Sequence, residues 1–366
     1  MKSNPPLKIC IVSEQLSGGG AEKAAAVLSN FFEKNQCIVY HVIVVDNVSY
    51  SFSGQLFNMG LLKNKSNSVW NKIQRFRHLN RFFKSHSFDF IIDNRVKNNF
   101  FQEFLITKLI YNAPVILVVH SFMINLYFPK NRFLAHRMYG KSFRIIAVSK
   151  EIQNRIESKF HFKNVQTLHN PIDFEEIEHK ISLPLQVNYR FVLAVGRLIQ
   201  VKQFEQLIAA YADSNLPQNQ IKLVILGDGA LKQSLIQMAT TLNQQNNVVF
   251  MGNVSNPFPY YKKALFTVLS SANEGFPMVL LESLACQTPV VAFDCFSGPS
   301  EIIKTNLNGI LVPNQNWSLL IEAMNKMVDN TDFAKHCANN SLQSVLCFET
   351  NKIGKQWINL FHQSNK

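Results

Sequence analysis

The chain has 366 residues, of which 47% are apolar and 17% are charged, and this balance excludes a disordered or fibrous protein. This length suits two α/β domains better than a single core. The formal net charge of +13 indicates a polyanionic partner, such as an anionic lipid, a nucleic acid or a phosphorylated acceptor.

The cysteines and the apolar runs bear on the compartment in which the protein works. The six cysteines show neither a C-x-x-C pair nor metal-ligand spacing with histidine, which is typical of buried thiols in a reducing cytosol. No apolar run approaches the ~20 residues that a membrane-spanning helix needs. The first apolar segment, 9–12, is too short for a signal peptide. We therefore expect a cytoplasmic protein.

The first predicted strand, 8–13, runs into a glycine-rich loop and then into a helix from about Ala24. The backbone N–H groups of Gly18, Gly19 and Gly20 face the start of that helix, and such an arrangement favours a phosphate. The loop is neither G-x-G-x-x-G nor a Walker sequence, so it does not specify NAD or ATP. The alternative is a flexible glycine turn.

A strongly basic segment follows, because no acidic residue occurs between Asn47 and Phe88. Apolar residues recur there every three to four positions and predict an amphipathic helix near 68–85, with an apolar stripe on the domain and an open cationic face. The stripe consists of Trp70, Ile73, Phe76, Leu79 and Phe83. The cationic face suits an anionic leaflet or a diphosphate-bearing lipid. The alternatives are a solvated face without a partner, or nucleic acid, which no recognised motif supports.

Two further strands are predicted at 88–93 and 114–120, and the second ends in His120. In open parallel sheets, ligands bind beyond the carboxyl ends of the strands, so His120 is placed to meet a ligand. The alternative is a strand-end histidine whose ring is satisfied by neighbouring backbone.

The second half of the chain opens with a predicted strand at 190–196, followed by Arg197 and Lys202. Lys202 would lie near a helix start, where a cation typically costs ~0.3–1 kcal/mol. Beside a diphosphate that cost reverses, because Arg197 offers a two-pronged fork and Lys202 a point charge. The alternative is a pair of basic surface residues.

A buried strand at 264–269 leads through the loop 274–277 into another predicted helix. The N–H groups near Pro277 to Leu280 form a potential phosphate site. Two carboxylates, Glu274 and Glu282, flank it, and a carboxylate beside a phosphate is favourable only where it accepts hydrogen bonds from hydroxyls. The pattern favours a ligand with phosphate and many hydroxyls; the alternative is an exposed pair of glutamates on an ordinary strand–helix unit.

With the sequence EGFPMVLLESLA, residues 274–285 resemble the nucleotide-sugar site of the retaining glycosyltransferases of family 4, which have the GT-B fold. The resemblance implies that Glu274 lies beside the donor sugar and that Glu282 binds the ribose hydroxyls. The backbone amides that follow Glu274 would touch sugar and diphosphate.

The resemblance extends to the glycine loop near the N-terminus, to the strand that ends in His120 and to the GRL-x3-K pattern from Gly196 to Lys202. It implies a catalytic group of His120, Glu274, Arg197 and Lys202. It implies donor-binding residues at Gly18, Gly19, Gly20, Arg197, Lys202, Gly227, Gly252, Val254, Glu274, Gly275, Phe276, Pro277, Met278, Val279, Leu280 and Glu282.

The fold class that the resemblance implies is α/β, with two Rossmann-like, doubly wound parallel-sheet domains that face each other across a cleft. We expect an acceptor-side domain at 1–174, a linker at 175–189 and a nucleotide-sugar-binding domain at 190–346. The last segment, 347–366, is expected to be a helix that crosses back to the first domain.

The implied activity is transfer, with retention, of a hexose or N-acetylhexosamine from a UDP-linked donor to a lipid-linked or surface-glycan acceptor. Arg197 and Lys202 would take the place of a metal ion, so no metal or cofactor is expected. The basic helix near 68–85 would hold the enzyme at the inner face of the cell membrane, with no role for nucleic acid. The alternatives are a sugar-nucleotide epimerase of the same fold, or a non-catalytic subunit that binds nucleotide sugars at the membrane.

Overall fold

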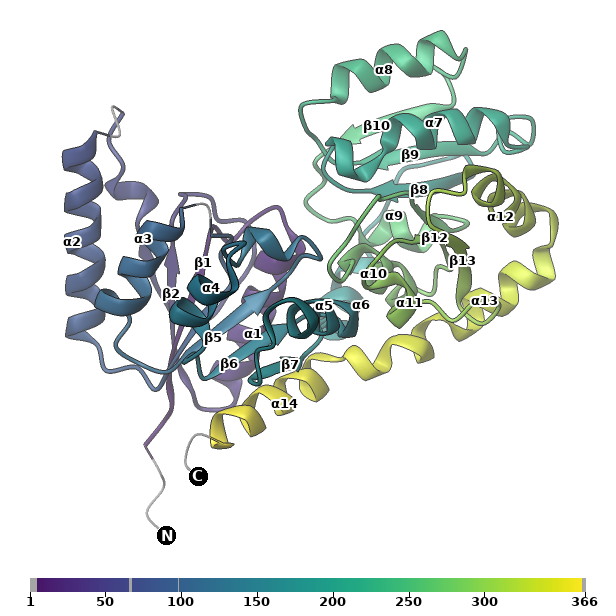
Figure 1. Ribbon diagram of the computed structural model, residues 1–366. Coiled ribbons are helices and arrows are strands. Elements are labelled where there is room, and N and C mark those ends of the chain that lie inside the picture. The colour runs from purple at the N-terminus through teal and green to yellow at the C-terminus, as the bar shows by residue number, and fades with distance from the viewer. Residues whose placement is uncertain (1–4, 66–67, 98, 364–366) are drawn as a thin grey trace. The chain divides into compact units, whose positions relative to one another are not determined.

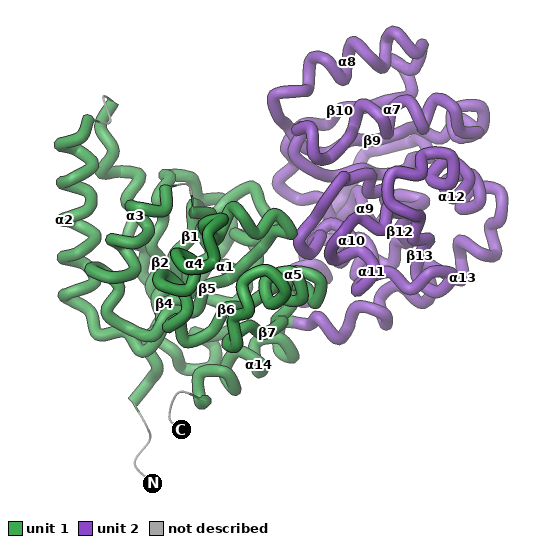
Figure 2. Tube along the Cα trace, in the orientation of Figure 1, with its two compact units in different colours: residues 1–171, 350–366 green, residues 172–349 purple. Residues whose placement is uncertain are grey.

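The computed structural model describes residues 5–65, 68–97 and 99–363. The chain folds into two compact units, coloured separately in Figure 2. The first unit contains residues 1–171 and 350–366, and the second contains residues 172–349. Each unit is built around one parallel sheet.

The sheet of the first unit has seven strands in the order β3-β2-β1-β4-β5-β6-β7, all paired in parallel (Figure 1). Its central strands are almost continuous apolar runs, because helices cover both faces of a parallel sheet. The strands are β1 Lys8–Ser13, β2 Ile38–Ile43, β3 Gln55–Asn58, β4 Phe90–Asp93, β5 Val115–Val119, β6 Arg144–Ala147 and β7 Val165–Thr167.

The helices of the first unit include the last helix of the chain, α14 Thr350–His362, which packs beside α1 (Figure 1). The rings of Trp357 and Phe361 lie 6.3 and 5.4 Å from that of Phe32 on α1. Gly354 allows the close approach, because a Cβ there would overlap the ring of Phe31. The other helices are α1 Gly20–Lys34, α2 Val69–Ser85, α3 Phe100–Leu105, α4 Arg132–Tyr139 and α5 Lys150–Phe160, with short turns at η1 Gly60–Leu62, η2 Ile106–Ile110 and η3 Ile124–Leu126.

The sheet of the second unit has six parallel strands in the order β10-β9-β8-β11-β12-β13. The strands are β8 Phe191–Val195, β9 Lys222–Leu226, β10 Val248–Gly252, β11 Thr267–Leu269, β12 Val290–Asp294 and β13 Gly309–Pro313. The helices are α6 Phe174–Ile181, α7 Phe204–Asp213, α8 Lys232–Thr241, α9 Phe258–Lys263, α10 Met278–Ala285, α11 Pro299–Ile302, α12 Trp317–Asp329 and α13 Thr331–Val345, with short turns at η4 Gln200–Lys202 and η5 Leu346–Phe348.

Both sheets reverse their strand order once, between β1 and β4 in the first unit and between β8 and β11 in the second. This order defines the doubly wound fold and places a crevice for ligands outside the carboxyl ends of the strands at the reversal. The predicted fold class, two doubly wound parallel-sheet α/β units, is confirmed.

The predicted linker, 175–189, is not wholly extended. Its first part belongs to α6, whose start is capped because the Asp173 side chain accepts a hydrogen bond from Glu176 N–H. Ile177 is buried, and Asn256 donates to the Lys180 carbonyl at 2.9 Å. Polar composition hid this helix, although an N-cap aspartate before it was a readable signal.

The predicted basic helix is present as α2, but the predicted apolar stripe is only partly buried. Leu79 and Phe83 belong to the core, whereas Trp70 and Ile73 are 60% and 40% exposed. The prediction that the whole stripe packs on the domain was therefore wrong for the first turns of α2. None of the helices in the described residues has the length and apolar character that crossing a lipid bilayer requires.

Candidate functional site

Lys202 and Glu274 meet where the strand order of the second sheet reverses. Lys202 ends the η4 turn after β8, and Glu274 lies in the loop between β11 and α10. Two hydrogen bonds join these segments: Ala272 N–H donates to the Val201 carbonyl and Ser270 Oγ donates to the Lys202 carbonyl, both at 2.9 Å. The position of both side chains thus follows from the strand order.

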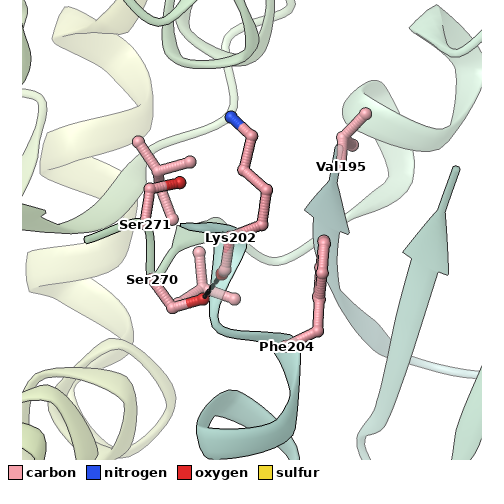
Figure 3. A pocket seen from close by; sticks show the side chains of 7 residues that line it. Val195, Lys202, Phe204, Ser270 and Ser271 are labelled. Atoms are coloured by element: carbon pink, nitrogen blue, oxygen red, sulfur yellow. Dashed lines mark hydrogen bonds between the residues drawn. The ribbon is translucent and has the colours of Figure 1, made fainter. Parts of the chain in front are cut away.

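The ammonium of Lys202 lies 2.5 Å from Glu274 Oε1, and both side chains are mostly covered, with 17% and 12% of their surface exposed. Lys202 precedes the start of α7 by two residues, so the glutamate offsets the unfavourable position of a cation at a helix start. Figure 3 shows Lys202 above a small hollow lined also by Val195, Phe204 and Ser271. In the ligand-free protein, Glu274 therefore neutralises the cation predicted to meet a diphosphate.

The loop from Glu274 to Pro277 is held by the loop that follows β12. Ser297 Oγ donates to the Gly275 carbonyl at 2.7 Å. Gly298 has a φ of +94°, and a Cβ there would come within 2.6 Å of Pro277 Cδ, so only glycine fits without displacing the loop. This packing fixes the entry into α10.

The start of α10 resembles an anion site in its local chemistry. Pro277 is its N-cap, no side chain caps it, and its first turn contains no acidic residue. The Leu280 N–H bonds the Pro277 carbonyl at 3.1 Å, so the predicted set of donors narrows to Met278 and Val279. Gly275 and Phe276 lie buried in the loop that precedes them.

Glu282, on the second turn of α10, is only 7% exposed. Its Oε2 accepts a hydrogen bond from the hydroxyl of Tyr261 on α9 at 3.1 Å. Burial, together with this carboxylate, raises the pKa of Tyr261 well above its usual value, so the phenol keeps its proton and remains a donor. Sequence reasoning missed Tyr261, because nothing near Glu282 in the chain points to α9.

The turns after β8, β9 and β10 are joined by backbone hydrogen bonds. Leu198 N–H donates to the Asp228 carbonyl at 2.9 Å, and Gly227 N–H donates to the Gly252 carbonyl at 2.8 Å. Gly227 has a φ of +135°, and a Cβ there would overlap the Gly196 carbonyl. The predicted residues Gly227 and Gly252 thus share one edge of the sheet.

Arg197 and Val254 lie beside these turns. Arg197 is exposed and makes no ion pair within residues 5–65, 68–97 and 99–363, which distinguishes it from Lys202. Val254 is half-buried in the loop after β10. The second unit therefore carries one paired and one exposed cation at the carboxyl edge of its sheet.

In the first unit, the predicted glycines occupy the carboxyl end of β1. Gly18 has a φ of +74°, Gly19 is the N-cap of α1, and Gly20 is its first residue. No side chain caps this helix start. The local structure that the sequence predicted, a glycine loop opening onto a helix, is present.

His120 follows β5 directly, and its Nε2 lies 2.9 Å from Oδ1 of Asn94, which follows the neighbouring strand β4. Burial lowers the pKa of His120 to about 4. Asn94 was missed by sequence reasoning, although its place directly after a buried strand was the same signal that singled out His120.

Models of known families match both halves of the chain. The model described as "Glycosyltransferase Family 4" matches residues 18–176, and the model described as "Glycosyl transferases group 1" matches residues 175–344. The first match lies in the unit that contains His120, and the second covers the Lys202–Glu274 pair.

The similar proteins with curated descriptions are glycosyltransferases. One from Campylobacter jejuni, N-acetylgalactosamine-N,N'-diacetylbacillosaminyl-diphospho-undecaprenol 4-alpha-N-acetylgalactosaminyltransferase, is 33% identical over 62% of this chain but only 61% of its own length. An uncharacterized glycosyltransferase of Methanocaldococcus jannaschii is 30% identical over 69% of this chain and 72% of its own. A second C. jejuni protein, which elongates a diNAcBac-PP-undecaprenol glycan with N-acetyl-D-galactosamine, is 27% identical over 97% and 98%.

Solved structures share the fold across the whole chain. Anabaena HepE in complex with UDP and glucose has a TM-score of 0.79, with 18% identity, and covers 98% of this chain and 100% of its own. S. aureus TarM in complex with alpha-GlcNAc-glycerol and UDP has a TM-score of 0.74, with 16% identity, over 97% and 99%.

Proposed function

This chain belongs to the glycosyltransferases of family 4, with the GT-B fold, and on that premise we propose that it transfers a sugar with retention of configuration. The donor is a UDP-linked hexose or N-acetylhexosamine, and the acceptor is a lipid-linked or surface glycan. The observation that carries this proposal is the Lys202–Glu274 pair, 2.5 Å apart beside the uncapped start of α10.

The pair supplies both groups that a nucleotide-sugar donor requires. When the donor enters, its diphosphate competes with Glu274 for the ammonium of Lys202. The released carboxylate then accepts hydrogen bonds from sugar hydroxyls. Departure of the diphosphate develops negative charge, which Lys202, exposed Arg197 and the first N–H groups of α10 stabilise. These cations act in place of a metal ion.

The nucleoside lies along the turns after β9 and β10, where backbone atoms of Gly227 and Gly252 are brought together. Glu282 accepts hydrogen bonds from the ribose hydroxyls, oriented from the other side by Tyr261. Support for uridine comes from the UDP complexes of HepE and TarM, which have this fold.

The acceptor class rests on the relatives and on one surface. Both C. jejuni relatives are described by glycans on diphospho-undecaprenol or PP-undecaprenol. On α2, exposed Val69, Trp70 and Ile73 stand among Lys72, Arg77, Arg81 and Lys84, all exposed. Each basic residue near an anionic leaflet contributes ~1 kcal/mol, so this surface can hold the enzyme reversibly at the inner face of the membrane, where such acceptors lie.

Thermal unfolding with a panel of UDP- and GDP-sugars tests the proposal, because selective binding to the folded state raises Tm. We expect one UDP-sugar to raise Tm and to be consumed only when a lipid-linked acceptor is added. Rapid epimer formation without acceptor would instead indicate an epimerase. No Tm change with any UDP-sugar, or a trapped covalent glycosyl-enzyme, would contradict the proposal.

A further inference from the structure

Asn94 and His120 form a side-chain pair at the carboxyl edge of the first sheet. They follow β4 and β5, which are parallel neighbours with Asp93 opposite Leu117. His120 Nε2 and Asn94 Oδ1 are 2.9 Å apart. No interaction of this pair was expected from the sequence.

The surroundings of the ring decide which nitrogen carries the proton. Nε2 faces an amide oxygen, which only accepts, so Nε2 has to donate. Nδ1 is buried and has no hydrogen-bond partner among the described residues. A proton on Nδ1 would leave a buried N–H without an acceptor, which is costly in free energy, so the Nε2–H tautomer is favoured.

The same geometry disfavours the imidazolium, because it would add that unsatisfied N–H. Burial accordingly lowers the pKa of His120 to about 4. The nearest charged groups are Asp93 on β4 and Glu22 on α1, which act on Tyr127, whose hydroxyl bonds the His120 main chain. Burial also raises the pKa of Tyr127, so this phenol carries no charge beside the ring.

A buried ionic cluster fixes Asn94 in place. Asp93 and Arg95 flank it in the chain and form an ion pair at 2.8 Å, and Lys97 lies 2.6 Å from the same carboxylate. Glu103 pairs with Arg95 at 2.9 Å. Two cations thus face two carboxylates, and the cluster adds little net charge near the ring. The Asn94 N–H also donates to the Val12 carbonyl at 2.8 Å.

We propose that Asn94 is a positioning residue that holds His120 as the neutral Nε2–H tautomer, so that His120 takes part in sugar transfer as a fixed neutral group and exchanges no proton. A general base needs an accessible lone pair and a pKa near the working pH. Here Nε2 is bound to Asn94 and Nδ1 is covered. The part of this inference that concerns transfer rests on the proposed function; the tautomer does not.

The first test is nitrogen-15 NMR of the full chain labelled at histidine, with the His120 signals identified by their loss in His120→Gln. We expect the Nε2–H pattern, unchanged from pH 8 to pH 5. An Nδ1–H pattern, or titration of this ring between pH 6 and 7, would overturn the inference. This result does not depend on any donor or acceptor.

The second test compares Asn94→Asp with Asn94→Leu, after thermal unfolding has shown that each is folded. A carboxylate at this position should raise the pKa of His120 by about 1 to 3 and leave Nε2–H as donor. Asn94→Leu should remove the tautomer preference, and either variant suffices if the other does not fold. An unchanged ring spectrum in a folded variant would show that Asn94 does not position His120.

The third test measures transfer. His120→Gln keeps a neutral donor close to the position of Nε2, and we expect at least tenfold more activity from it than from His120→Leu. A general base would lose ~10²–10⁴-fold in both variants, and equal losses in folded proteins would overturn the neutral role. Asn94→Asp should gain a rise of kcat with pH as its ring loses the added proton. Should no sugar be transferred at all, the proposed function fails, while the NMR result stands or falls by itself.

Discussion

The hydroxyl of Tyr261 donates a hydrogen bond to Glu282 Oε2 over 3.1 Å, so the carboxylate proposed to bind ribose is oriented by a residue from another helix. Tyr261 is fully buried on α9, and Glu282 is 7% exposed on α10. The two helices pack together in the second unit.

Tyr261→Phe should therefore weaken donor binding. Loss of a hydrogen bond to a charged group corresponds to about 1.5–3 kcal/mol, so we expect KM for the donor to rise by tenfold or more while kcat changes little. Isothermal titration with the donor and steady-state kinetics measure this. The matched control is Tyr211→Phe, whose buried hydroxyl donates to the Ile221 carbonyl at 2.8 Å. It should lower stability alone; equal KM values in the two variants would contradict the role of Tyr261.

Lys202→Ala should abolish most activity. It removes a cation aimed at the leaving diphosphate and leaves Glu274 without its partner, so we expect kcat to fall by ~10²–10³-fold. Single-turnover kinetics separate this loss from product release. Lys180→Ala is the control, because it breaks an exposed ion pair with Glu176 on α6 and should leave turnover intact. Near-normal turnover in Lys202→Ala would refute the site.

Glu282→Ala should likewise lose most activity in a folded protein, chiefly through donor affinity. The ribose hydroxyls would lose an acceptor, and Tyr261 would be left as a buried donor, so Tm should also fall modestly. Donor titration and thermal unfolding report the two effects separately. Unchanged donor affinity would show that the ribose lies elsewhere.

Stability should fall in mild acid because of His41. This residue on β2 is fully buried, and burial lowers its pKa from 6.5 to about 4. The unfolded chain binds a proton that the folded chain excludes, so stability is full above pH ~6.5, falls between pH 6.5 and 4, and then levels off, with a loss of ~3 kcal/mol for this residue.

Urea unfolding at pH 7.5 and 4.5 measures that loss, to which His120 contributes in the same direction. His41→Leu should make the difference between the two pH values smaller, whereas His78→Ala, at an exposed position on α2, should not. Equal pH dependence in wild type and His41→Leu would exclude His41 as a cause.

Charge reversal on α2 should release the protein from anionic membranes. Lys72→Glu, Arg77→Glu and Arg81→Glu together should reduce binding to vesicles that contain phosphatidylglycerol by at least tenfold, since each basic residue contributes ~1 kcal/mol. Vesicle sedimentation gives the affinity. Reversal of exposed Lys304, Lys335 and Lys352 changes the net charge equally and should have a smaller effect. Equal losses would mean that net charge alone governs binding.

Local patterns predicted the elements that carry the site, because hydrophobic periodicity and loop chemistry act over a few residues. The predicted strand at 190–196 is β8 Phe191–Val195, and the helix expected from Met278 to Cys286 is α10 Met278–Ala285. The basic helix near 68–85 is α2 Val69–Ser85. The burial of Trp70 was predicted wrongly, because periodicity shows which face of a helix is apolar but not how far the core extends along it.

The amino-acid sequence by itself determined two doubly wound sheets, the glycine turns at strand ends and the residue types around the candidate site, since each depends on neighbours along the chain. Only the tertiary structure decided the partners: Lys202 with Glu274, Tyr261 with Glu282 and Asn94 with His120. These pairs join residues from different elements, and their distances follow from strand order and helix packing. The charge state and free hydrogen-bonding capacity of each group depend on burial and on those partners, which is why the chemistry of the site became definite only in the folded chain.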